Sequence, residues 1–128
     1  MYEVCVKSSF SAAHRLREYE GRCEAMHGHN WSVEVHVRGA DLNKTGMLVD
    51  FKAVREALKA VLDGLDHHDL NETDAFRKTN PTSENIARHI FGLLSGLLNA
   101  AGRKVQSVRV YETEGASAAY WEEGTGND

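Results

Sequence analysis

The stretch that decides the fold is HNWSVEVHVR, residues 29–38. Apolar and polar residues alternate along it, with Trp31, Val33, Val35 and Val37 on one face and Ser32, Glu34, His36 and Arg38 on the other. In a β-strand, successive side chains point to opposite faces, so a period of two is typical of a half-buried strand. The stretch therefore predicts a strand within a sheet that is buried on one side only.

Several other segments have the pattern of strands or loops. Residues 2–10 predict a first strand, and residues 47–49 predict a short one. Residues 105–113 and 117–122 predict two strands joined by a Glu-Gly turn. The polar segment 14–28 has no clear periodicity and predicts a loop, and a loop of this length in a small domain is usually functional or disordered.

Two helices are predicted between the strand pairs. Asp50 is a suitable N-cap for the first helix, which should end near Gly64. The second helix begins within NPTSE, residues 80–84, where capping side chains, a first-turn proline and an early carboxylate coincide, and it ends by Gly102. The residues expected on the buried stripe of this second helix are Ile86, Ile90, Leu93, Leu94, Leu97 and Leu98.

The order strand, strand, helix, helix, strand, strand predicts an α+β fold. We expect a four-stranded antiparallel sheet with both helices on one face. No repeat or linker interrupts the pattern, so residues 1–128 are expected to form a single domain. An open sheet has two edge strands that must be protected, and pairing with other subunits is one solution. The sequence therefore predicts an oligomer.

The composition excludes several classes of protein. Among 128 residues, 15 Lys and Arg stand against 19 Asp and Glu, and a net charge of −4 disfavours a nucleic-acid partner. No segment approaches the roughly 18 consecutive apolar residues of a membrane span. The first residues lack the pattern of a secretory signal, so we expect a cytoplasmic protein with no membrane partner. Cys5 and Cys23 are then expected to be reduced thiols.

Seven histidines are the most unusual feature of the composition. His27 and His29 share one face if the central strand extends back to residue 27, and His14 would neighbour them in a hairpin. Three neutral imidazoles leave a zinc ion one open position, which is typical of catalytic rather than structural sites. His36 and His89 fall on predicted polar faces and are assigned no role.

Cys23 lies four positions before His27 and has three interpretations. As a thiolate it is a fourth zinc ligand that closes a structural site. In the second interpretation, it lies beside an open site and acts as a base or nucleophile. The third interpretation is a small buried residue, which is also the one preferred for Cys5 in the first strand.

Three further groups carry side chains suited to chemistry. Asp66 beside His67 has the arrangement that orients an imidazole for proton transfer, although both residues also fit a solvated turn. Glu112 has the parity of the apolar face of its strand, where a carboxylate suits the amidine-like edge of a guanine or pterin unless the strand end is exposed. Thr82 and Ser83 are explained most simply as a helix cap.

Five segments occur in a distinctive order along the chain. They are FSAAH (10–14), CEAMHGH (23–29), LDH (65–67), PTSEN (81–85) and YET (111–113). Together they resemble the 6-pyruvoyltetrahydropterin synthase and 6-carboxytetrahydropterin synthase family, from residue 2 to about residue 121. The resemblance implies the tunnelling fold, in which subunits close their sheets into a trimeric barrel and two barrels stack into a hexamer with active sites between subunits.

The resemblance also implies three functional groups: zinc ligands, catalytic residues and contacts to the pterin. The implied zinc ligands are His14, His27 and His29. The implied catalytic residues are Cys23, Asp66 and His67, and the implied contacts to the pterin are Glu112, Thr82 and Ser83. The zinc would acidify hydroxyls of the substrate side chain, the cysteine would act as general base with the Asp-His pair as its partner, and the glutamate would anchor the pterin ring. Candidates for binding a triphosphate, by position only, are Lys7, Arg15, Arg17 and Arg22.

The spacing C-x-x-x-H-G-H from Cys23 is similar to that of bacterial 6-carboxytetrahydropterin synthases, whereas the pyruvoyl enzymes usually have a longer insertion there. This implies a zinc-dependent lyase that converts 7,8-dihydroneopterin triphosphate to 6-carboxytetrahydropterin, with loss of triphosphate and a two-carbon aldehyde, in the route to queuosine. A folate-synthesis subgroup with glutamate in the role of the cysteine is disfavoured by Cys23, but Glu24 keeps it open. The sequence is also compatible with a 6-pyruvoyltetrahydropterin synthase acting on the same substrate, and with a non-enzymatic, zinc-stabilised binding or assembly module.

Overall fold

The computed structural model describes residues 1–123. Its centre is a long hairpin of β1 (Tyr2–His14) and β2 (His27–Gly39), paired antiparallel from Tyr2 opposite Gly39 to His14 opposite His27. The predicted alternation of β2 is confirmed, because Trp31, Val33, Val35 and Val37 are fully buried. Both strands are longer than predicted, and the added residues are those that carry His14 and His27.

The sheet has five strands in the order β3-β1-β2-β4-β5. The strands β4 (Arg103–Thr113) and β5 (Ala116–Tyr120) continue it antiparallel beyond β2, as predicted. The two-residue strand β3 (His68–Asp69) pairs parallel with β1. The prediction of a four-stranded antiparallel sheet is therefore wrong at this edge. A two-residue strand has no periodicity to detect, and it forms only because the chain after the first helix lies against β1.

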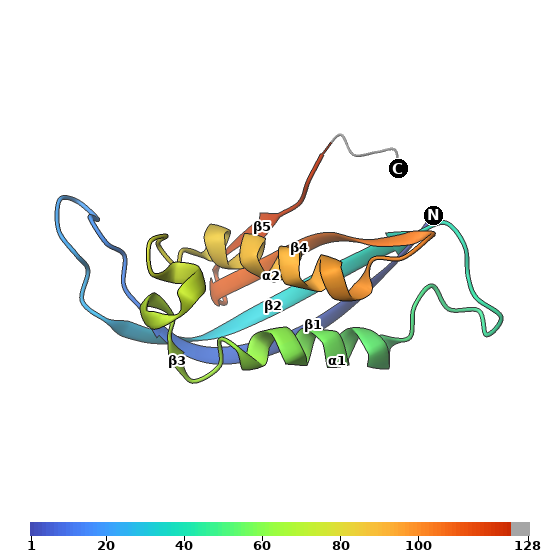
Figure 1. Ribbon diagram of the computed structural model, residues 1–128, viewed down its shortest axis with the longest axis horizontal. Coiled ribbons are helices and arrows are strands. Elements are labelled where there is room, and N and C mark those ends of the chain that lie inside the picture. The colour runs from blue at the N-terminus through green and yellow to red at the C-terminus, as the bar shows by residue number, and fades with distance from the viewer. Residues whose placement is uncertain (124–128) are drawn as a thin grey trace.

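Two helices cover one face of the sheet (Figure 1). The helix α1 (Phe51–Asp63) is capped by Asp50, whose side chain accepts a hydrogen bond from the amide of Lys52. The helix α2 (Ser83–Leu98) is capped by Thr82. Both N-terminal caps were predicted. Between the helices lie two short 3₁₀ helices, η1 (Leu70–Glu72) and η2 (Asp74–Phe76), whose apolar residues Leu70 and Phe76 enter the core.

Three details differ from the sequence-based expectation. Residues 47–49 do not form a strand. Leu93 and Leu97 are exposed, because α2 turns only its other apolar positions toward the sheet. His89 is half-buried and packs against the ring of Phe76, with ring centroids 5.4 Å apart, rather than lying on a solvated face.

Within the described part of the chain, no helix is long and apolar enough to cross a membrane.

Candidate metal centre

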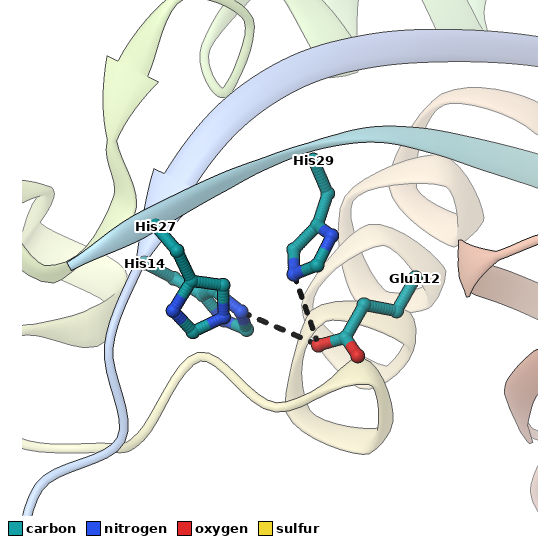
Figure 2. A group of neighbouring side chains, drawn as sticks. All are labelled: His14, His27, His29 and Glu112. Carbon is teal, nitrogen blue, oxygen red and sulfur yellow. Dashed lines mark ion pairs between the residues drawn. The ribbon is translucent and has the colours of Figure 1, made fainter. Parts of the chain in front are cut away.

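Three histidines converge where β1 ends and β2 begins (Figure 2). His14 is directly opposite His27 in the hairpin, and His29 is opposite Ala12. The period of two places His27 and His29 on the same, helix-covered face of β2. The ring centroids lie 4.6 Å apart for His14 and His27, 5.3 Å for His14 and His29, and 4.9 Å for His27 and His29. The predicted convergence of the three imidazoles is therefore confirmed.

Backbone carbonyls orient two of these rings. Nδ1 of His14 lies 2.8 Å from the carbonyl oxygen of Pro81, and Nδ1 of His27 lies 2.9 Å from that of Ala25. A carbonyl oxygen only accepts, so Nδ1 carries the proton and Nε2 keeps its lone pair. Metal-bound histidines commonly have this second hydrogen bond, which fixes the tautomer and the direction of the ring.

The Nε2 atoms of His14 and His29 are buried and, among the described residues, have no hydrogen-bond partner. Buried polar atoms are nearly always satisfied, so two such atoms aimed at one point need an explanation. Burial also lowers the pKa of His29, an effect that outweighs the opposing influence of Glu112. Neutral imidazoles with free lone pairs are the form that binds a divalent metal, so this donor set fits a metal ion.

Glu112 reaches the same point from the end of β4. Its Oε2 lies 3.3 Å from Nε2 of His14 and 3.6 Å from Nε2 of His29 (Figure 2). The ligand atoms of His14, His27, His29 and Glu112 all lie within 4.8 Å of one another. In a tetrahedral zinc site with bonds of about 2.0–2.1 Å, ligand atoms are about 3.4 Å apart. The geometry thus allows Glu112 to be a fourth ligand, or to lie beside a three-histidine site that keeps one position open.

Cys23 is a free, exposed thiol in the segment between β1 and β2 and does not belong to this group. The interpretation of Cys23 as the ligand that closes the site is therefore wrong within a single chain. The interpretation as a small buried residue is wrong for Cys23 and also for Cys5, because both residues are exposed. The neighbouring Glu24 is already engaged, since its Oε1 accepts a hydrogen bond from the amide of Leu16 at 3.1 Å.

Asp66 and His67 form an ion pair on the other side of β1, with Oδ2 and Nδ1 3.0 Å apart. The second carboxylate oxygen of Asp66 accepts a 2.8 Å bond from the amide of Ser11, which holds the pKa of Asp66 below its usual range. His67 has a left-handed backbone, with φ of 59°, and its side chain is 82% exposed. Such backbone strain in a non-glycine residue is frequent at functional sites.

An open cavity of about 550 Å³ adjoins this pair. Its lining includes Ser11, Gly28, His29, Asn30 and His67. No hydrogen bond or ion pair within residues 1–123 connects Asp66 or His67 to the three-histidine group. The described chain thus presents two clusters of potential catalytic groups that are joined by no bond, although His29 and His67 line the same cavity.

The N-terminus of α2 borders the histidines. Thr82 is an N-cap, because its hydroxyl oxygen accepts a 3.1 Å bond from the amide of Asn85. Ser83 is the first residue of the helix. The preceding residue, Pro81, is the one bonded to His14, so the start of α2 is tied to the three-histidine group through Pro81.

Arg17, one of the candidates for an anion contact, has a structural role instead. Its guanidinium donates to the carbonyl oxygens of Asn71, Phe76 and Thr79 at 3.2, 2.7 and 3.3 Å. The side chain of the buried Asn71 bonds both the amide and the carbonyl of Arg15. These hydrogen bonds hold the loop after β1 against residues 71–79, and they were not predicted from the sequence. The only sequence signal for them is the position of Asn71 in a polar turn.

The chain is similar in sequence to proteins of a known family. Residues 3–123 match the family model "6-pyruvoyl tetrahydropterin synthase". The chain is 36% identical over 126 residues to a 6-carboxy-5,6,7,8-tetrahydropterin synthase of Synechocystis, covering 94% of each chain. It is 35% identical over 99 residues to a 6-pyruvoyl tetrahydrobiopterin synthase of Drosophila melanogaster, covering 66% of this chain and 59% of the relative.

A similar fold has been solved. The structure of a 6-pyruvoyl tetrahydropterin synthase from Caenorhabditis elegans superposes with a TM-score of 0.78 at 28% identity, over 96% of this chain and 98% of that one. Sequence, sheet topology and the histidine cluster at the β1–β2 end thus lead to one conclusion: this chain belongs to the 6-pyruvoyl tetrahydropterin synthase family.

Proposed function

We propose that the chain is a zinc-dependent 6-carboxy-5,6,7,8-tetrahydropterin synthase. In this proposal it converts 7,8-dihydroneopterin triphosphate to 6-carboxytetrahydropterin, acetaldehyde and triphosphate, a step toward queuosine and related deazapurines. The observation that carries it is the pair of buried imidazole nitrogens without a hydrogen-bond partner in the three-histidine group. The similarity to the Synechocystis relative and the spacing from Cys23 to His27 support the carboxy product.

His14, His27 and His29 would hold the zinc ion. When bound there, zinc supplies Lewis acidity that lowers the pKa of substrate hydroxyls and polarises a forming carbonyl. The chain contributes orientation: the bonds to Pro81 and Ala25 keep the His14 and His27 rings directed at the site. Buried against Trp31, with ring centroids 4.9 Å apart, His14 has little freedom to turn away.

Glu112 anchors the pterin ring in this proposal. A carboxylate accepts two hydrogen bonds at once, and the pterin edge offers adjacent N–H groups in a matching geometry. Oε2 of Glu112 lies 3.3 and 3.6 Å from two imidazole nitrogens. A pterin ring bound to Glu112 would therefore place the side chain of the substrate at the metal. Thr82 and Ser83, beside Pro81, line the same pocket.

Cys23 removes and returns protons at the substrate carbons, and Asp66 with His67 is its partner pair. The ion pair between Asp66 and His67 orients the imidazole. Because this pair is separate from the histidine group within one chain, the proposal includes active sites that form between subunits of a hexamer. The open edges of the sheet, β5 on one side and β1 with the two-residue β3 on the other, are available for such pairing.

A 6-pyruvoyltetrahydropterin synthase activity on the same substrate is the second candidate, supported by the similarity to the Drosophila relative. It would eliminate triphosphate and retain all carbons of the side chain. The two products differ in mass, so they can be distinguished directly.

The test is to incubate the zinc-loaded protein with 7,8-dihydroneopterin triphosphate and to analyse the products by mass spectrometry. We expect 6-carboxytetrahydropterin and acetaldehyde, and we expect Cys23→Ala to lose turnover while retaining zinc. A pyruvoyl product would move the protein to the sister activity. Absence of turnover in the wild-type chain would favour a zinc-stabilised binding or assembly module.

A further inference from the structure

The face of the sheet opposite the helices carries a second group of metal-ligating side chains. Cys5 on β1 is directly opposite His36 on β2, and Glu34 is two residues from His36 on the same face. The two helices cover only the other face (Figure 1). This outer group therefore lies across the sheet from the core, and it is distinct from the three-histidine centre.

The ligand atoms of the outer group are spaced like those around one ion. Sγ of Cys5 lies 3.7 Å from Nε2 of His36, and this nitrogen lies 3.3 Å from Oε1 of Glu34. All three atoms are within 4.8 Å of one another. With metal bonds of about 2.0 Å to nitrogen and oxygen and 2.3 Å to sulfur, tetrahedral ligands stand about 3.3 Å apart for nitrogen and oxygen and about 3.5 Å apart for sulfur and nitrogen. The spacing between His36 and Glu34 equals the first value, and the spacing between Cys5 and His36 exceeds the second by about 0.2 Å.

The other ring nitrogen of His36, Nδ1, also has a hydrogen-bond partner. Nδ1 lies 3.1 Å from Oε1 of Glu3, and Oε2 of Glu3 accepts a 2.6 Å bond from Nε of Arg38. The bond from Arg38 keeps the pKa of Glu3 below its usual value, against the opposing effect of burial. A carboxylate on the far nitrogen of a histidine fixes the orientation of the ring, as it does around many bound metals.

Glu34 is oriented in the same way. Its Oε2 accepts a 2.9 Å bond from the hydroxyl of Tyr111 and lies 3.4 Å from Nζ of Lys7. Burial disfavours its ionised form, but these bonds and the one with His36 outweigh burial and lower the pKa of Glu34. Its Oε1 remains directed at His36 and Cys5.

We propose that Cys5, Glu34 and His36 form a second metal site, for a divalent transition metal of the zinc class. A thiolate, an imidazole and a carboxylate favour zinc over magnesium or calcium, which prefer oxygen ligands alone. The thiolate and the carboxylate would together neutralise the two charges of the ion. Burial and Glu34 raise the pKa of the Cys5 thiol, so the metal displaces a proton when it binds.

This inference is independent of the proposed function. A cross-strand network of ion pairs explains Glu3, Arg38, Lys7 and Glu34, but it gives no role to a thiol at the centre of the group. Since the site is on the other face of the sheet, its occupancy does not require the three-histidine centre to be loaded.

Cobalt(II) is the probe for the first test, because a cobalt–thiolate bond has a charge-transfer band in the near ultraviolet. Under reducing conditions, we expect wild-type protein and Cys23→Ser to develop this band, and Cys5→Ser and His36→Gln to lack it. His68→Gln is the matched control, since His68 is an exposed histidine outside both groups. A band lost in Cys23→Ser and kept in Cys5→Ser would overturn the proposal.

Zinc stoichiometry is the second test, measured by equilibrium dialysis and elemental analysis. We expect one more zinc ion per wild-type chain than per Cys5→Ser chain, which is two against one when the three-histidine centre is also loaded. Tyr111→Phe keeps all three ligands but frees Glu34, so zinc affinity at this site should fall about 10-fold. Equal stoichiometry in wild type and Cys5→Ser, or no effect of Tyr111→Phe on affinity, would contradict the site. Far-ultraviolet circular dichroism checks that each variant is folded.

Discussion

His14 donates its Nδ1 hydrogen to the carbonyl oxygen of Pro81 across 67 positions of sequence, at 2.8 Å. This bond connects the end of β1 to the residue before the cap of α2. It satisfies a buried donor and leaves Nε2 of His14 directed at His29 and Glu112. The hairpin brings the imidazoles together, and the helix N-terminus determines which nitrogen of His14 faces the site.

Substitution of His14 should remove the metal from the three-histidine centre. We expect His14→Gln to reduce zinc at that centre from one ion per chain to nearly none, because two remaining imidazoles are a weak zinc site. The measurement is zinc content after dialysis, made in a Cys5→Ser background so that the outer site does not contribute. His67→Gln is the control and should retain zinc. Full zinc retention in His14→Gln would show that His14 is not a ligand.

Substitution of Glu112 distinguishes its two geometric roles. If Glu112 anchors the substrate, Glu112→Gln retains zinc but binds the substrate poorly, since an amide cannot accept the same pair of hydrogen bonds with a charge. We expect unchanged zinc content and a loss of at least about 10-fold in kcat/KM, the cost of one charged hydrogen bond. Loss of zinc from the same variant would instead identify Glu112 as the fourth ligand.

Arg17 should contribute to folding stability more than to an anion site. Its guanidinium donates to three carbonyl oxygens of residues 71–79, and those acceptors lose their partner in Arg17→Met. We expect the free energy of unfolding to fall by about 2 kcal/mol, the range for hydrogen bonds to a charged group. Arg22→Met, at an exposed position of the same segment, is the matched control and should change stability little. Urea denaturation measures both, and equal values would refute the bracing role.

His89 should make the metal-free protein less stable in mild acid. Burial holds the pKa of His89 below its ordinary value of 6.5, so the unfolded chain binds a proton more readily than the folded one. The stabilisation is present above about pH 6.5 and is lost as the pH falls from there through the folded-state pKa. The free energy of unfolding, measured by urea denaturation between pH 7.5 and 5.5, should therefore fall less in His89→Phe than in wild type. The difference is limited to about 1.4 kcal/mol per pH unit, the value for one proton. Parallel pH profiles would contradict this prediction.

Much of the fold could be predicted from the sequence because its signals are local. The alternation around Trp31 identified the buried face of β2, and Asp50 and Thr82 identified the starts of both helices. The histidine cluster could also be predicted, since a hairpin with two residues per repeat brings His14 opposite His27. Each of these inferences depends on residues within a few positions of one another, or on one simple pairing.

The tertiary structure alone decided the remaining features. The parallel strand β3, the exposure of Leu93 and Leu97, the bracing by Arg17 and the pairing of Cys5 with His36 have no local pattern in the sequence. Cys5 and His36 are 31 positions apart, and a shift of one residue in the β1–β2 register would place them on opposite faces. Sequence periodicity specifies which face of an element is buried, whereas contacts between distant residues depend on register and docking, which are set by the packing of the whole core.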